Sequence, residues 1–108
     1  PGAIQVDVRE EDDYVVVIAD LPGVDKSDVS LRLLDPGTLQ ISTQQRAEME
    51  EEREGYFVRE RTYGGVSRLV CLPTDVTDEG ATTTFKNGVL EVRLLKTVEE
   101  RGKRIPVT

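Results

Sequence analysis

Few side chains of this 108-residue chain are capable of covalent or acid–base catalysis. The sequence has no histidine and one cysteine, Cys71, so neither a Ser-His-Asp triad nor a Cys/His zinc cluster can form. Gly64 and Gly65 lack the lysine and the following helix that a phosphate-binding loop needs. We therefore expect a protein that is not an enzyme and that binds no cofactor.

Carboxylates gather in two short runs, at residues 10–13 and 50–52. Neither run has the spacing of a calcium-binding loop, so a solvated turn and a solvated loop explain them better, and we expect no metal site. The net charge of −7 argues against a nucleic-acid partner, which requires a basic surface. No apolar run is long enough to span a bilayer, so we expect no membrane partner.

Alternation of apolar and polar residues, the period of a half-buried strand, extends over most of the chain. It places Ile4, Val6 and Val8 on one face of the first strand. Residues 14–19 are rich in β-branched side chains, which predicts a central strand covered on both faces. Later strands present one apolar face each, made by Val29, Leu31 and Leu33 and by Leu90, Val92 and Leu94.

Turn residues separate these segments. Asn87-Gly88 is typical of a tight hairpin turn with positive φ, and the Asp-Pro-Gly sequence at residues 35–37 predicts another hairpin. Residues 65–72 form a further apolar strand, in which we expect Cys71 to be a buried thiol. About eight short strands without a long helix predict an all-β, immunoglobulin-like sandwich of two antiparallel sheets.

A polar, mostly acidic segment at residues 44–55 cannot bury enough apolar surface to pack, so we expect a solvated loop there. A short segment of strand-forming composition follows it and consists of Tyr56, Phe57, Val58, Arg59, Glu60 and Arg61. A strand on a long hydrophilic arm can pair with the edge of a second molecule, or it can fold back onto its own sheet. The residue pattern leaves both arrangements open.

Two branched apolar residues stand near the C-terminus, in Ile105-Pro106-Val107. They follow a polar stretch, residues 99–104, that we expect not to fold on its own. In an extended chain Ile105 and Val107 point the same way, and Pro106 favours an extended conformation at Ile105. Such a motif suits an apolar groove on this molecule or on another; the alternative is a frayed terminus.

Arg68 is a charged residue in an unusual place. By the period of two it shares a face with Val66, Val70 and Leu72. A guanidinium on an apolar face requires a carboxylate or carbonyl partner, because burying it unpaired is costly. The alternative is a position at a strand end, from which the side chain reaches water.

Four of these features follow one another in a recognisable order. They are Asp-Leu-Pro-Gly-Val at residues 20–24, residues 60–68 closed by Leu72-Pro73, Asn-Gly-Val-Leu at residues 87–90, and Ile105-Pro106-Val107. Together, and over nearly the whole chain, they resemble the α-crystallin domain of small heat-shock proteins. The long arm with its own strand resembles the bacterial, archaeal and plant members rather than the metazoan ones.

The resemblance implies an α-crystallin domain at residues 1–95, whose loop 44–61 carries a dimerisation strand, and a C-terminal extension at residues 96–108. It implies that residues 56–61 pair with the edge strand of a second chain, the strand that holds Ile4, Val6 and Val8, and that Arg68 anchors structure near this interface. We call Ile105-Pro106-Val107 the docking motif. The groove for this motif, or for a client, would be lined by Val29, Leu31, Leu33, Thr83 and Phe85.

The function that the resemblance implies is ATP-independent holding of unfolding proteins in the cytoplasm, by a homodimer that assembles into larger homo-oligomers. The unpaired Cys71 agrees with a reducing compartment. The alternatives are a monomeric co-chaperone or adaptor sandwich that binds one folded partner, and a secreted structural sandwich. Because the sequence begins at Pro1 without a methionine, we expect it to be a piece of a longer chain with an N-terminal arm.

Overall fold

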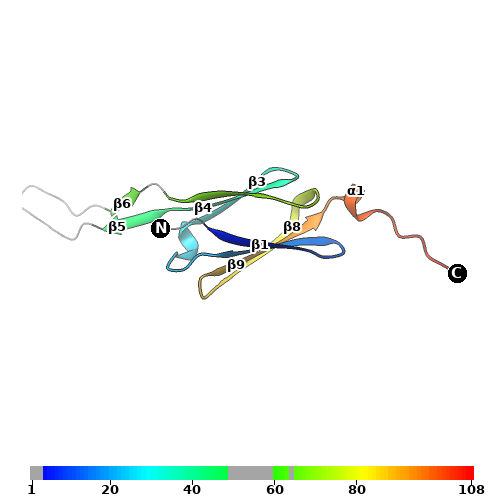
Figure 1. Cartoon of the computed structure of the whole chain (residues 1–108), viewed down its shortest axis with the longest axis horizontal. Coiled ribbons are helices and arrows are strands. Elements are labelled where there is room, and N and C mark those ends of the chain that lie inside the picture. The colour runs from blue at the N-terminus through cyan, green and yellow to red at the C-terminus, as the bar shows by residue number, and fades with distance from the viewer. Residues whose placement is uncertain (1–3, 49–59, 64) are drawn as a thin grey trace, which may run out of the picture.

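The computed structural model of the chain describes residues 4–48, 60–63 and 65–108 (Figure 1). The elements of this part of the chain are β1 (Gln5–Glu10), β2 (Tyr14–Asp20), η1 (Lys26–Asp28), β3 (Val29–Asp35), β4 (Thr38–Thr43), β5 (Gln45–Glu48), β6 (Glu60–Tyr63), β7 (Ser67–Cys71), β8 (Val76–Lys86), β9 (Val89–Lys96) and α1 (Val98–Arg101). The strands form a four-stranded sheet in the order β1-β2-β9-β8, a three-stranded sheet in the order β3-β4-β7, and a two-stranded sheet of β5 and β6. Each pairing is antiparallel.

The two larger sheets enclose one hydrophobic core. Every second residue of β4 and β9 is buried, as the period of two predicts for strands with one face in a core. Leu39 and Ile41 of β4 and Val70 of β7 meet the buried valines and leucines of β2 and β9 there. The all-β, immunoglobulin-like sandwich of two antiparallel sheets is therefore confirmed.

Strand β2 is the centre of the four-stranded sheet. It lies between β1 and β9, and Val15 and Val17 are fully buried in the core. Val16 faces the other side of the sheet and is fully buried as well. Its neighbours in register are Arg9 and Arg93, whose long aliphatic stems are well placed to cover it. The prediction of a strand covered on both faces is confirmed.

The Asn87-Gly88 turn joins β8 to β9 with φ angles of 52° and 77°, as the sequence predicts for this tight hairpin. The Leu21 N–H donates a hydrogen bond of 2.7 Å to the Gly88 carbonyl oxygen. A Cβ atom added at Gly88 would lie 3.3 Å from the Pro22 Cα atom. The turn after β2 and the turn before β9 therefore lie against each other.

The prediction of a loop at residues 44–55 is wrong for residues 45–48. Gln45–Glu48 forms β5, which pairs with β6 in a hairpin that extends away from the sandwich (Figure 1). A strand that pairs with another strand satisfies its backbone groups without burying apolar side chains, so a polar composition did not exclude it. Of the strand expected at residues 56–61, Glu60 and Arg61 lie in β6, whereas residues 56–59 lie outside the described residues.

Cys71 is exposed, so the expectation of a buried thiol is wrong. Val70 is buried in the core, and adjacent residues of a strand point to opposite faces. Cys71 therefore shares the outer face of the three-stranded sheet with Leu69, which is 57% exposed. Because the strand is apolar on both faces, its composition suggested that both are buried, whereas the structure buries only the face of Val70.

The expectation that residues 99–104 do not fold on their own is wrong for residues 99–101. These residues belong to α1 (Val98–Arg101), and the Thr97 hydroxyl caps this turn by accepting a hydrogen bond of 3.3 Å from the Glu100 N–H. Gly102, with a φ of 71°, ends the helix. Only the residues after this glycine leave the sandwich as extended chain (Figure 1).

Candidate functional site

The sandwich has two open sides. Each side is made by two edge strands, one from each of the two larger sheets. The edges are β1 and β8 in the four-stranded sheet, and β3 and β7 in the three-stranded sheet. The Arg68 Nη1 atom of β7 donates a hydrogen bond of 2.6 Å to the Ile4 carbonyl oxygen before β1, so β7 and β1 lie on one side. The Val76 N–H of β8 donates a hydrogen bond of 2.8 Å to the Pro36 carbonyl oxygen after β3, so β8 and β3 share the other side.

On the first side, β1 offers a strand edge. One edge of β1 is bonded to β2, and within the described residues no strand pairs with its other edge. Ile4 is 5% exposed, and Val6 and Val8 are partly buried against the core. Their inward faces fix the register of β1, so its outer edge presents backbone groups that no described strand pairs with. The strand that would occupy this edge stays a prediction.

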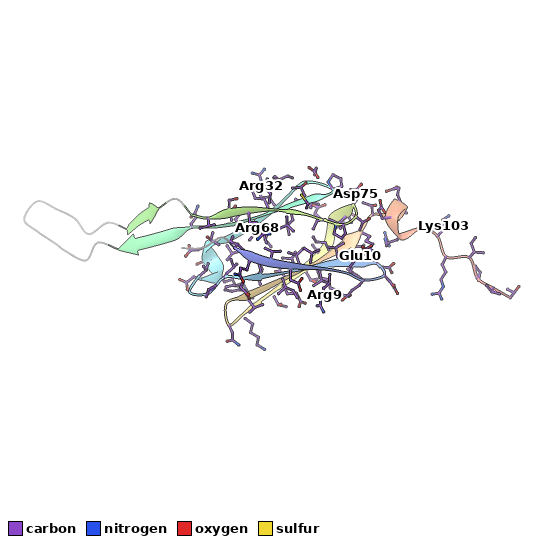
Figure 2. All side chains as sticks on the ribbon, viewed as in Figure 1. Arg9, Glu10, Arg32, Arg68, Asp75 and Lys103 are labelled. Carbon is purple, nitrogen blue, oxygen red and sulfur yellow. The ribbon has the colours of Figure 1, made fainter. Side chains whose placement is uncertain are left out.

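Arg68 stands where β1 and β7 meet (Figure 2). It lies opposite Ile41 in the β4–β7 pairing and so belongs to the inward face of β7, as the period of two predicts. The residue is exposed at this margin, and its guanidinium donates to the Ile4 carbonyl oxygen. Both interpretations of the sequence thus hold in part, because Arg68 has a carbonyl partner and also reaches water.

We call the second side the β3–β8 margin. Its apolar side chains face the core side of their sheets, since their partners in register are buried residues of β4 and β9. Val29, Leu31, Leu33 and Phe85 are only partly buried, and Thr83 is exposed. The structure therefore places the five residues that the resemblance assigned to a groove along the open side of the core; that another chain binds there stays a prediction.

The docking motif lies away from this margin. The exposed fraction is 84% for Ile105 and 98% for Val107. The chain is fixed up to residue 101, because the Thr97 N–H donates to the Asp75 carbonyl oxygen at 3.1 Å and the Arg101 Nε atom donates to the Lys96 carbonyl oxygen at 3.0 Å. Beyond this point the chain projects from one end of the sandwich, opposite the end that holds β5 and β6 (Figure 1).

An ion pair that the sequence did not reveal lies at the base of this projection. Lys96 is 7% exposed, and its Nζ atom lies 2.9 Å from the Glu10 Oε2 atom. On the other face of the same sheet, the Arg93 guanidinium lies 2.8 Å from the Glu11 carboxylate and 4.3 Å from the centroid of the Tyr14 ring. The alternation along β9 could have predicted a buried Lys96, because this residue continues the inward series of Leu90, Val92 and Leu94.

These surfaces suit the binding of chain segments rather than catalysis. An unpaired strand edge binds another strand through backbone hydrogen bonds, and a partly exposed apolar margin binds branched side chains. In the parts of the chain that the structure describes, no three carboxylates or thiols are grouped to hold a metal ion. Within the same residues, no helix is long and apolar enough to cross a membrane.

The structure thus defines a β-sandwich with two open sides and an exposed apolar motif on an extended chain. The chain belongs to the Hsp20/alpha crystallin family, whose model matches residues 7–108. This membership confirms the resemblance to small heat-shock proteins and supports a chaperone role.

Relatives from bacteria and plants are named as small heat shock or heat shock proteins. The chain is 37% identical over 101 residues to spore protein SP21 of Stigmatella aurantiaca, which covers 94% of this chain and 59% of the relative. It is 36% identical over 103 residues to the 17.6 kDa class I heat shock protein 1 of Arabidopsis thaliana. This match covers 95% of this chain and 66% of the relative. The chain thus spans about three-fifths to two-thirds of the length of these curated relatives.

Solved structures share the fold. Heat shock protein 16.0 of Schizosaccharomyces pombe is similar with a TM-score of 0.66 and 32% identity, over 100% of this chain and 98% of the other. A small heat-shock protein of Xylella fastidiosa, described as having a distinct high order structure, is similar with a TM-score of 0.64 and 32% identity, over 99% and 97% of the two chains. The α-crystallin sandwich is therefore the fold of this chain.

Proposed function

We propose that this chain is the assembly and binding module of an ATP-independent holdase chaperone, which binds unfolding proteins before they aggregate. The observation that carries the proposal is the exposed docking motif on a molecule whose β3–β8 margin leaves apolar side chains partly uncovered. Two apolar surfaces that are exposed in one copy can cover each other between copies. We propose no enzymatic activity, no cofactor and no nucleic-acid or membrane partner.

The first level of assembly is a homodimer that forms by strand exchange. The strand of residues 56–61 of one chain would add to the open edge of β1 of the other, and the reverse. The support is the position of β1 at the rim of its sheet, together with an arm that leaves the sandwich as the β5–β6 hairpin. Added strands gain backbone hydrogen bonds along the whole edge, so this contact is expected to be the stable one.

The second level joins dimers through the docking motif. Burial of Ile105 and Val107 contributes roughly 3–5 kcal/mol before the cost of ordering the extension and joining two bodies. A single contact is therefore weak, and many such contacts in one particle add through effective concentration. Contacts of this strength open and close, which uncovers the β3–β8 margin for non-native clients.

The α1 turn shortens the reach of this contact. Because the chain is fixed to residue 101, only residues 102–104 separate the sandwich from Ile105, a span of about 10 Å when fully extended. The estimate for an unfolded stretch from residue 96 to 104 would be about 30 Å. Neighbouring dimers must therefore approach closely at the end of the sandwich that holds α1.

The charge of the chain fits a holdase of the cytoplasm. A net charge of −7 keeps copies and their client complexes apart and soluble. The exposed thiol of Cys71 stays reduced in that compartment without a partner cysteine.

The test is suppression of client aggregation together with particle mass. A thermally unfolding client should stay in solution when this chain is added without nucleotide, and light scattering should give a mass of a dimer or more at micromolar concentration. A monomer that binds one folded partner and leaves client aggregation unchanged would refute the proposal, and would favour the adaptor alternative.

A further inference from the structure

The β3–β8 margin has two chemically different ends. The turn after β3 is bonded to the first residue of β8, so β3 and β8 run along the margin in opposite senses from a shared end. We call this shared end, near Asp35 and Asp78, the acidic end. The other end holds η1, which precedes β3, and Lys86, the last residue of β8.

Four exposed carboxylates stand at the acidic end, namely Asp35, Asp75, Asp78 and Glu79. Asp78 and Glu79 lie where β8 bulges, because Thr77 is opposite Leu95 whereas Thr82 is already opposite Arg93. Among the described residues none of the four carboxylates is in an ion pair. The opposite end instead carries two exposed lysines, Lys26 and Lys86, besides the carboxylates of Asp25 and Asp28.

The docking motif is asymmetric in charge but nearly symmetric in shape. Lys103 and Arg104, both exposed, precede it directly, and no charged side chain follows it before Thr108. Ile105 and Val107 are both β-branched and two residues apart, so a shape-based fit differs little between the two directions of entry. Charge is then the property that separates the two directions.

We propose that the docking motif enters the β3–β8 margin of another copy in one direction, with Lys103 and Arg104 at its acidic end and Thr108 toward η1. The inference rests on the proposed docking between copies and adds its direction. In this direction the motif runs parallel to β8, and both cations meet carboxylates that are in no ion pair among the described residues. In the reverse direction they would face an end where two lysines offset two carboxylates.

The size of the effect follows from exposed charges. Two surface ion pairs favour one direction by about 2- to 10-fold in affinity, and added salt reduces this preference.

Figure 2 shows Asp75 and Lys103 near the same end of the molecule, with Lys103 on the projecting chain. The acidic end of one copy is therefore also the end from which its own extension leaves.

Disulfide mapping tests the direction with every charge intact. The full chain carries Cys71→Ser, and one set of copies then carries Thr108→Cys. The other copies carry either Ser27→Cys, in η1, or Ala81→Cys, at the bulge of β8; both positions are exposed. We expect the Thr108→Cys copy to cross-link to the Ser27→Cys copy several-fold faster than to the Ala81→Cys copy. Equal or inverted rates would overturn the inference.

A control separates this result from the docking itself. Adding Ile105→Gly and Val107→Gly to the Thr108→Cys copy should abolish both cross-links. If it does not, the proposed docking fails and the direction fails with it. If both cross-links vanish in the control but form at equal rates in the parent, docking holds and only the direction is wrong.

Charge reversal provides a second readout. Asp78→Lys with Glu79→Lys should raise the concentration at which particles dissociate by about 2- to 10-fold at low salt, with little effect at high salt. Lys103→Glu with Arg104→Glu should restore assembly in the same chain. The matched control is Asp20→Lys with Asp25→Lys, the same change of charge at exposed positions toward the other end of the sandwich. An equal effect of the control, or no restoration, would contradict the inference.

Discussion

The Arg68 guanidinium lies 2.6 Å from the carbonyl oxygen of Ile4 and joins the edge strands of the two sheets on one side of the sandwich. Ile4 is 5% exposed and directly precedes β1, so this bond fixes the start of the strand that we propose as the receiving edge for a partner. In the dimer that we propose, Arg68 would thereby act through the position of β1.

Arg68→Gly should loosen this edge. The loss of the bond leaves the Ile4 carbonyl without its donor, which costs about 1–2 kcal/mol of folding stability and frays the start of β1. We expect a lower melting temperature, faster hydrogen exchange in β1 and a greater tendency to aggregate. Arg32→Gly is the matched control, because Arg32 is exposed on β3. Unchanged melting temperature and oligomer mass in Arg68→Gly would show that Arg68 stabilises neither the β1 edge nor the oligomer.

Deletion of residues 56–61 should abolish the dimer. The open edge of β1 would then have no strand to receive, while the core of the two larger sheets stays complete. Mass by light scattering is the measurement. A deletion of the same length at residues 49–54 removes mostly acidic residues and keeps the strand, so it should stay dimeric. A dimer that survives the first deletion would show that strand exchange is wrong.

Ile105→Gly combined with Val107→Gly should convert larger particles to dimers. Both side chains are almost fully exposed in the single chain, so their removal costs no folding stability, and the far-ultraviolet spectrum should not change. Val98→Ala removes apolar surface from α1, outside the motif, and should leave particle size unaltered. If the double glycine variant keeps its particle size, the extension does not join dimers.

The faces of the strands could be read from the sequence because a buried face forces alternation. Val29, Leu31 and Leu33 share a face in the structure as they do in the pattern, and Asn87-Gly88 adopts the positive φ angles that its residue types favour. The assignment of the five margin residues to one groove came instead from the resemblance to small heat-shock proteins. The structure places them on the inward faces of two edge strands, and their role as a groove stays a prediction.

Other features depend on contacts that no local pattern records. The β5 strand is polar and exists through its pairing with β6, so composition argued for a loop. The bond from Arg68 to Ile4 spans 64 residues of sequence. The Glu10–Lys96 ion pair likewise requires the end of β1 to meet the end of β9, which the order of strands decides.

The Glu10–Lys96 pair should matter more for stability than the Glu11–Arg93 pair on the other face of the sheet. The Lys96 side chain is only 9% exposed, whereas the Arg93 side chain is 40% exposed. Glu10→Ala leaves a buried ammonium without its carboxylate, which costs about 1–3 kcal/mol, while Glu11→Ala should cost less than about 1 kcal/mol. Unfolding in urea measures both.

A second variant checks the cause of that difference. Glu10→Ala combined with Lys96→Met removes both charges and leaves an apolar chain of similar length, so stability should return toward that of the parent. Equal effects of Glu10→Ala and Glu11→Ala, or a double variant as weak as Glu10→Ala, would show that burial of Lys96 is not the reason.

Gly65 should tolerate no side chain, for a reason of space. A Cβ atom at this position would overlap the carbonyl group of Thr43. The Thr43 N–H donates a hydrogen bond of 2.8 Å to the Val66 carbonyl oxygen, which holds the entry of β7 against the end of β4. Gly65→Ala must push these two segments apart, and we expect a loss of about 1–3 kcal/mol in unfolding free energy.

Gly37→Ala is the control for this prediction. At Gly37 an added Cβ would meet its nearest atom, the Asp75 Oδ1 atom, at 3.4 Å, so this variant should change stability little. Equal unfolding midpoints for the two variants would show that β7 does not need this close approach.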